Sequence, residues 1–268
     1  MNAGAAALPA LDIAVRREGC GPSRLERRRV AHPWSLGRGY PAADPAGPLT
    51  VIPQVAGAGL LSGDAVAQRV EVGAGAALRL VSAGAMLVHG GGRVARSRWD
   101  WRLEPGARAV QAAEPHVLMP GAALELVTEV VLAPSGLYLG FEGVCRPGCD
   151  PADWSAQTRA LRPHGEVLFA DRQAADPDDF ARLARLPGAP AAFGSLLLLG
   201  PKEVHAALPE GPLDLPGAWG AVAPLRAGAG RMARIACADG GALRAAGLAL
   251  LARVAGALGL GDPGAGPA

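Results

Sequence analysis

The side chains of this chain best suited to hold a metal ion are two cysteines and one histidine. Cys145 and Cys149 form a C-x3-C pair around a Pro-Gly dipeptide that predicts a turn, and thiolates at this spacing bind soft metal ions. His89 precedes three glycines and is expected at an exposed strand end. A closed structural site needs about four ligands, and no second pair is adjacent. Cys145, Cys149 and His89 are therefore either weak metal ligands or, in the alternative interpretation, ordinary loop thiols and a surface histidine.

Several carboxylates fall beside predicted strand ends, among them Asp64, Glu114, Glu142 and Asp171. Such groups either line a polar passage or cap turns, and the sequence leaves both interpretations open. No G-x-S-x-G elbow, H-E-x-x-H, P-loop or paired C-x-x-C is present, so no catalytic residue is predicted.

The stretch V-A-G-A-G-L-L-S-G-D, residues 55–64, approaches the glycine fingerprint of a phosphate loop. That interpretation requires a helix immediately after it. Instead, Val66, Val70 and Val72 alternate with Arg69 and Glu71, which is the period of a half-buried strand. The stretch is therefore predicted to be a tight connection between two strands, not a phosphate site.

Charge and composition narrow the function classes. A net charge of +2 gives no electrostatic reason to expect nucleic-acid binding. The basic run at residues 24–29 fits a polyanion or membrane-surface site, or a solvated edge strand. The N-terminus lacks the features of a secretory signal, and residues 243–260 are too interrupted to predict a membrane span. The four cysteines are then expected to be thiols in a cytoplasmic protein.

The elements that must position these residues are mainly strands. Alternation predicts strands over residues 98–103, 124–132, 137–144, 166–170, 193–199 and 232–238. Turn glycines recur near every fifteenth residue at Gly75, Gly91, Gly106, Gly121 and Gly136, which favours stacked antiparallel sheets or a meander. Helices are predicted after the N-cap Asp176, with an Asp178–Arg182 pair, and over residues 242–258. We expect a flexible segment 1–23, one β domain over 24–260 and a disordered tail 261–268.

The glycine stretch and its surroundings resemble the UreD (UreH) family of urease accessory proteins. The family's pattern is close to G-G-L-x-G-G-D, a strand and a G-x-G-A turn, and this chain has G-L-L-S-G-D (Gly59, Leu60, Leu61, Gly63 and Asp64 among its residues) followed by V-G-A-G-A at 72–76. Downstream matches occur in the family's order at Pro120-Gly121-Ala122, Glu142, Gln157, Arg162, Gly165, Leu168 and Asp171-Arg172. The resemblance covers residues 24–173. The segments 81–89 and 144–153 depart from the family's pattern.

The resemblance implies a mostly β protein with two helices and a non-enzymatic role. UreD-like proteins bind a UreF-like partner that recruits a UreG-like GTPase, and the assembly docks on apo-urease for nickel insertion. The implied cargo is Ni²⁺ in transit through a polar tunnel, with no tightly bound cofactor. The expected path residues are Asp64, Glu142 and Asp171, and the Gly59–Asp64 loop is expected to be structural.

Two alternatives to this function follow from the residues. A carbohydrate-active enzyme on a stacked β scaffold would use Glu125 and Glu129 as its carboxylate pair and Trp99 and Trp101 to line a groove. A generic binding module would expose an apolar patch and have no urease partner.

Overall fold

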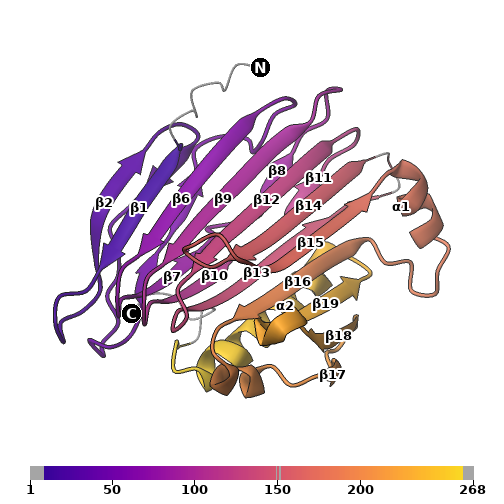
Figure 1. Ribbon diagram of the computed structural model, residues 1–268. Helices are drawn as coiled ribbons and strands as arrows, with labels where there is room; N and C mark the ends of the chain where they lie inside the picture. Colours follow the sequence, from indigo (N-terminus) through magenta and orange to yellow (C-terminus); the bar gives the residue numbers. More distant parts are fainter. Residues whose placement is uncertain (1–8, 149, 151, 262–268) are drawn as a thin grey trace.

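The computed structural model describes residues 9–148, 150 and 152–261, which fold into two stacked β-sheets with two α-helices (Figure 1). The mainly β fold with two helices in the C-terminal region confirms the fold class expected from the sequence. Within the described residues, no helix is long and apolar enough to cross a membrane.

The first sheet has seven strands in the order β15-β14-β12-β9-β6-β1-β2, and the second has ten, with β17-β18-β19-β16-β13-β10-β7-β4 as its main path and β8 and β11 beside it. The first contains β1 (Leu11–Arg16), β2 (Arg24–Val30), β6 (Ala65–Val72), β9 (Ala95–Leu103), β12 (Ala123–Leu132), β14 (Asp153–Leu161) and β15 (Val167–Ala175). The second contains β4 (Leu49–Val51), β7 (Ala77–Val81), β8 (Met86–Val88), β10 (Arg108–Ala112), β11 (His116–Leu118), β13 (Leu137–Cys145), β16 (Ala192–Leu199), β17 (Gly211–Pro212), β18 (Ala218–Pro224) and β19 (Gly230–Cys237). The remaining elements are the pair β3 (Trp34–Leu36) and β5 (Pro53–Val55), the 3₁₀ turns η1 (Lys202–Ala207) and η2 (Arg226–Gly228), and the helices α1 (Pro177–Leu183) and α2 (Gly240–Ala257).

The middle of the chain winds as a superhelix of strands, here called the coil, in which each strand of the first sheet is followed by a strand of the second. β6, β9, β12 and β14 belong to the first sheet, and the segments between them supply β7, β10 and β13 to the second. Neighbouring strands of these sets pair in parallel. This corrects the predicted antiparallel arrangement, because a chain that returns to the same sheet after one visit to the other runs in the same direction each time. Among the described strands, antiparallel pairs join β1 to β2, β3 to β5, β13 to β16, β14 to β15, β16 to β19, and β18 to both β17 and β19.

The fifteen-residue glycine rhythm marks the corners of this coil. Gly75 and Gly106 lie at successive turns from the first sheet to the second, and both have a positive φ, of 66° and 71°. Gly75 donates its N–H to the carbonyl of Pro105, which stacks one corner on the next. A residue without a Cβ adopts this conformation without strain. Each turn of the coil passes two such corners, one in each direction between the sheets. A glycine spacing of about fifteen residues therefore corresponds to about thirty residues per turn of the coil.

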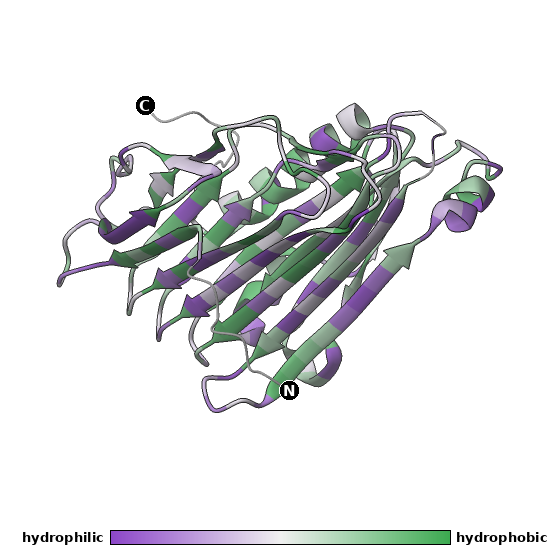
Figure 2. Cartoon of the chain, turned by 90° about the horizontal axis from the view of Figure 1, so that it is seen from above, coloured by the Kyte–Doolittle hydropathy of each residue, from purple (hydrophilic) through white to green (hydrophobic). Residues whose placement is uncertain are grey.

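The space between the sheets and the space under α2 form separate hydrophobic cores. Alternating residues of the first sheet turn inward and the others face solvent, which appears as banding along the strands in Figure 2. The inward residues pack against the second sheet, with Trp101 and Tyr138 in edge-to-face contact at 5.4 Å between ring centroids. The outer face of the second sheet is covered by α2, which packs on Phe141 and its neighbours. The layers are thus sheet, sheet and helix.

The N-terminal segment differs from its prediction as a flexible end. Residues 11–16 form β1, whose Leu11, Ile13 and Val15 are fully buried, and β1 lies between β2 and β6. The basic run at residues 24–29 falls in β2, the edge strand of the seven-stranded sheet, which confirms the edge-strand interpretation of that run. Residues 1–8 and 262–268 lie outside the described residues.

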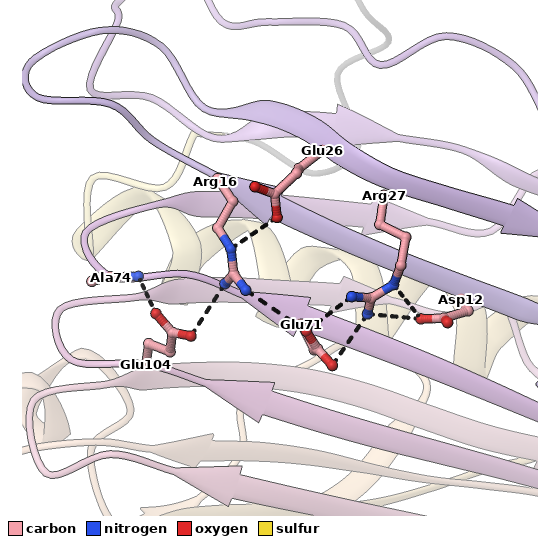
Figure 3. A network of polar contacts seen from close by, with 7 residues as sticks. All are labelled: Asp12, Arg16, Glu26, Arg27, Glu71, Ala74 and Glu104. Carbon is pink, nitrogen blue, oxygen red and sulfur yellow. Dashed lines mark hydrogen bonds and ion pairs between the residues drawn. The ribbon is translucent and has the colours of Figure 1, made fainter.

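Ion pairs tie these N-terminal strands to the coil (Figure 3). Arg27 of β2 reaches Asp12 of β1 at 2.8 Å and Glu71 of β6 at 3.1 Å. Arg16 contacts Glu71 at 3.7 Å and Glu104, beside a coil corner, at 3.2 Å. Because Glu71 is shared by both arginines, the network crosses three strands on the outer face of the sheet and does not depend on one exposed pair.

Both helices begin after an aspartate N-cap, and the first begins where the sequence predicts. Asp176 caps α1 in a capping box with Asp179, and Pro177 occupies the first turn. In place of the predicted Asp178–Arg182 pair, Arg182 pairs with Asp179 at 2.5 Å, at a spacing of three residues and not four. Asp239 caps α2 by accepting from the N–H of Ala242. The second helix begins two residues earlier than predicted because this cap lies before two glycines.

Two glycines of α2 test how closely the helix approaches the sheet. A Cβ on Gly247 would lie 2.7 Å from both Cε atoms of Phe141, whereas a Cβ on Gly256 would meet nothing within 4 Å. Gly247→Ala is expected to destabilise the protein by about 1–3 kcal/mol through overpacking. Gly256→Ala is expected to stabilise the protein by about 0.5–1 kcal/mol, because alanine lowers the conformational entropy of the unfolded chain and meets no other atom in the folded one. Urea unfolding of both variants checks this, and equal effects of the two would contradict the packing.

Candidate functional site

The ten-stranded sheet is interrupted where its strands β7 and β10 end. β7 stops at Val81 and β8 resumes at Met86, and the same break separates β10 from β11. A cavity opens at these breaks, lined in part by Ser97, Trp99, Glu114 and His116. Ser97 and Trp99 lie on the inward-facing parity of β9 in the other sheet. The cavity therefore lies between the strand breaks of one sheet and the inner face of the other, with Trp34 and residues 53–55 also in its lining.

Polar side chains continue from this cavity along the inner face of the seven-stranded sheet. Gln68, Trp99, Thr128, Thr158 and Asp171 are in register across β6, β9, β12, β14 and β15. Gln68, Thr128 and Thr158 are buried, and neither polar atom of the Gln68 amide has a partner among the described protein atoms. Buried amides and hydroxyls of this kind are satisfied by other polar groups, water or ligands. One row of the apolar interior is therefore polar.

The facing strands of the ten-stranded sheet supply the matching groups. Glu142, Ser195 and Arg234 are in register on β13, β16 and β19. Thr128 donates its hydroxyl proton to Oε1 of Glu142 across the gap between the sheets. Arg234 donates to Oγ of Ser195 at 2.6 Å and pairs with Asp171 of the other sheet at 2.5 Å. We call these five residues, with Thr158 and Gln173, the inter-sheet row.

Glu142 is the acidic centre of the inter-sheet row. A small cavity beside it is also lined by Trp154, Gln173 and Ser195. Burial raises the pKa of the Glu142 carboxyl, and the hydrogen bond from Thr128 opposes that rise. A carboxylate held there without a cation nearby is disfavoured, which makes this position attractive to a positive charge.

The structure brings together two of the three path residues expected from the resemblance. Glu142 and Asp171 both belong to the inter-sheet row, whereas the Asp64 carboxylate accepts the N–H of Leu61 at 2.8 Å and closes its own turn. Sequence reasoning missed Thr128, Ser195, Gln173 and Arg234. One signal for Thr128 was available: it is the polar member of an otherwise apolar parity in β12. The other three could be found only from the pairing of distant strands.

The Gly59–Asp64 loop packs against β8. Leu60 is fully buried and exchanges backbone hydrogen bonds with Leu87 and His89 of the neighbouring segment. Gly59 has a φ of 117°, and a Cβ there would overlap the carbonyl of Leu87. A Cβ on Gly63 would lie 2.6 Å from the Arg93 guanidinium carbon, while Leu61 is exposed.

The weak metal candidates are spread over the fold. His89 bonds the carbonyl of Ala58 through Nε2 at 2.9 Å. Cys145 is a buried free thiol, and burial, with the nearby charge of Asp239, raises the pKa of that thiol. Cys149 lies outside the described residues. Among the residues that are described, no three His, Cys, Asp or Glu side chains gather as a metal-ion cluster.

The groups proposed for a carbohydrate-active enzyme lie on opposite faces of one sheet, which corrects that alternative. Glu125 and Glu129 face outward and pair with arginines, Glu125 with Arg96 at 2.9 Å. Trp99 and Trp101 face inward and stack on each other at 6.1 Å. The carboxylates and the aromatic rings therefore cannot line one groove.

His116 predicts a pH dependence of stability. Burial lowers its pKa from 6.5 to about 4, against the opposing effect of a hydrogen bond with the backbone of Gly143. Because the unfolded chain binds the proton more readily, stability should fall as pH drops from 6.5 towards 4, by on the order of 2 kcal/mol. His116→Gln should flatten this slope in urea unfolding at several pH values. Exposed His164→Gln is the control, and an unchanged slope in His116→Gln would contradict the assignment.

Comparison with known proteins identifies the family. The family model described as UreD urease accessory protein matches residues 7–267. Urease accessory protein UreD 1 of Bradyrhizobium sp. strain BTAi1 is 31% identical over 241 residues, which cover 84% of this chain and 83% of that protein. UreD 3 of Bradyrhizobium sp. strain ORS 278 is 32% identical over 90% of this chain and 88% of its own, and UreD of Mycolicibacterium smegmatis is 32% identical over 88% and 86%. This chain belongs to the UreD family of urease accessory proteins.

Proposed function

We propose that the chain is a scaffold and nickel conduit for urease maturation. In this role it acts without catalysing a reaction and passes Ni²⁺ to apo-urease along the inter-sheet row. It works in the cytoplasm with a UreF-like protein and a UreG-like GTPase, as the family resemblance implies. Ni²⁺ is the cargo of this chain and not a resident cofactor.

The observation that carries the proposal is the line of oxygen donors between the sheets. It begins at the cavity beside the strand breaks of the ten-stranded sheet, passes Thr128 and Glu142, and ends at Ser195 and Asp171. Carboxylate, hydroxyl and imidazole groups are suitable ligands for a divalent cation in water-lined sites. Donors that are spaced along a row, and not gathered around one point, favour repeated weak binding, which lets an ion enter and leave.

The role is tested by urease activity in cells supplied with nickel that carry the cognate structural and accessory genes, with or without this chain. Loss of activity with apo-urease still present supports maturation. Full activity without it, and without a second UreD-like protein, contradicts the proposal. Co-purification with the UreF-like protein tests the scaffold part separately, and a well-folded chain that never associates counts against it.

Glu142→Gln tests the conduit itself. The amide keeps the shape of the side chain and the acceptor for Thr128 but removes the charge that attracts the cation. At limiting nickel, urease activation should fall by about tenfold or more. Glu125→Gln is the matched control, because Glu125 lies on the outer face of the same pair of sheets and pairs with Arg96. Activation equal to wild type in Glu142→Gln, with nickel content of urease measured directly, would exclude Glu142 from the path.

A further inference from the structure

An arginine occupies the end of the inter-sheet row at which Asp171 lies. Arg234 projects inward from β19, pairs with Asp171 at 2.5 Å and donates to Ser195 at 2.6 Å. Gln173 of β15 donates to the same Ser195 hydroxyl at 3.4 Å. The guanidinium thus takes up both oxygen donors at this end of the row.

This arrangement conflicts with free passage of a dication. A guanidinium keeps its positive charge at all physiological pH values, so it repels a metal ion at close range. It also neutralises Asp171, the carboxylate that would otherwise attract the ion. A cation that has reached Glu142 meets the positive charge of Arg234 before it meets the Asp171 carboxylate.

The same pair is placed where it can open. The Arg234 side chain is 38% exposed and that of Asp171 is 20% exposed, although Oδ2 of Asp171, the oxygen that faces the guanidinium, is itself buried. Solvent therefore reaches the pair mainly from the arginine side. Pairs at such exposure contribute little to stability, and a long arginine side chain is able to turn towards solvent.

We propose that Arg234 is a latch that masks Asp171 and Ser195, and that a cation binds these two groups only after Arg234 is displaced. The inference rests on the proposed conduit and adds to it a residue that controls when the terminal carboxylate is available. With the latch closed, this end of the row binds a dication weakly. With it open, Asp171 and Ser195 form a second binding step beyond Glu142.

The test is Ni²⁺ binding to the purified full chain without a histidine tag, measured by calorimetry in a non-coordinating buffer. Arg234→Gln should bind Ni²⁺ about tenfold more tightly than wild type, since one carboxylate is unmasked. The double variant Arg234→Gln with Asp171→Asn should return to the wild-type affinity. Arg234→Lys keeps the charge but cannot bridge both partners, and it should fall between wild type and Arg234→Gln.

Arg231→Gln is the matched control for the latch. Arg231 lies on the same strand but on the opposite parity, and it pairs with Glu210 at 2.7 Å. Its replacement frees a carboxylate away from the inter-sheet row, so Ni²⁺ affinity should stay at the wild-type value. Thermal unfolding of every variant establishes that it is folded, and the lysine variant provides the comparison where glutamine is not tolerated.

The outcomes separate the latch from the conduit. Wild-type Ni²⁺ affinity in folded Arg234→Gln, or a gain that persists in the double variant, overturns the latch. Either result is compatible with a loss of urease activation in Glu142→Gln, in which case the conduit stands without it. A tenfold gain that depends on Asp171 supports the latch, and normal activation in Glu142→Gln alongside it would remove the conduit while leaving the masked site.

Discussion

The tight corners between the two sheets are the constraint on which the rest of the structure depends. Each corner sends the chain from one sheet to the other after one strand, so both layers are built together and successive coils pair in parallel. Gly75 and Gly106 make two of these corners with backbone conformations that a side chain would strain. Because successive coils have nearly the same length, residues about thirty positions apart come into register. That register lines up Gln68, Trp99 and Thr128, which are far apart in the sequence.

A polar row inside such a sandwich costs free energy of folding unless its groups are hydrogen-bonded or bind an ion. Trp101, Tyr138 and the surrounding aliphatic side chains fill one part of the space between the sheets. Beside them, the Glu142 carboxyl is held where burial raises its pKa, and the Gln68 amide has no partner among the described protein atoms. An apolar replacement of these groups would give a more stable sandwich. Their retention is understandable if the row serves a cation.

Charged side chains lie both on the outer face of the seven-stranded sheet and on its inner face, between the sheets. The outer face of the seven-stranded sheet carries arginines and carboxylates in ion pairs, such as those around Glu71, which join neighbouring strands (Figure 3). The inner face carries few charges, and those at its far end, Asp171 and Arg234, come from different sheets. The outer network therefore joins neighbouring strands of one sheet, whereas the inner pair links the two sheets, as the Thr128–Glu142 and Gln173–Ser195 hydrogen bonds also do.

The sequence by itself determined the element types, the helix caps and the family. Period-two alternation identified strands such as β12, Asp176 identified the start of α1, and G-L-L-S-G-D identified the resemblance, because these are local patterns set by neighbouring residues. Tertiary structure alone decided the parallel direction of the strands and the place of the N-terminal strand β1 within the sheet. It also decided that Glu142 and Asp171 share a row with Ser195 and Arg234, whereas Asp64 closes its own turn. Strand direction and cross-sheet contact depend on which distant segments pair, and a single sequence does not encode that pairing locally.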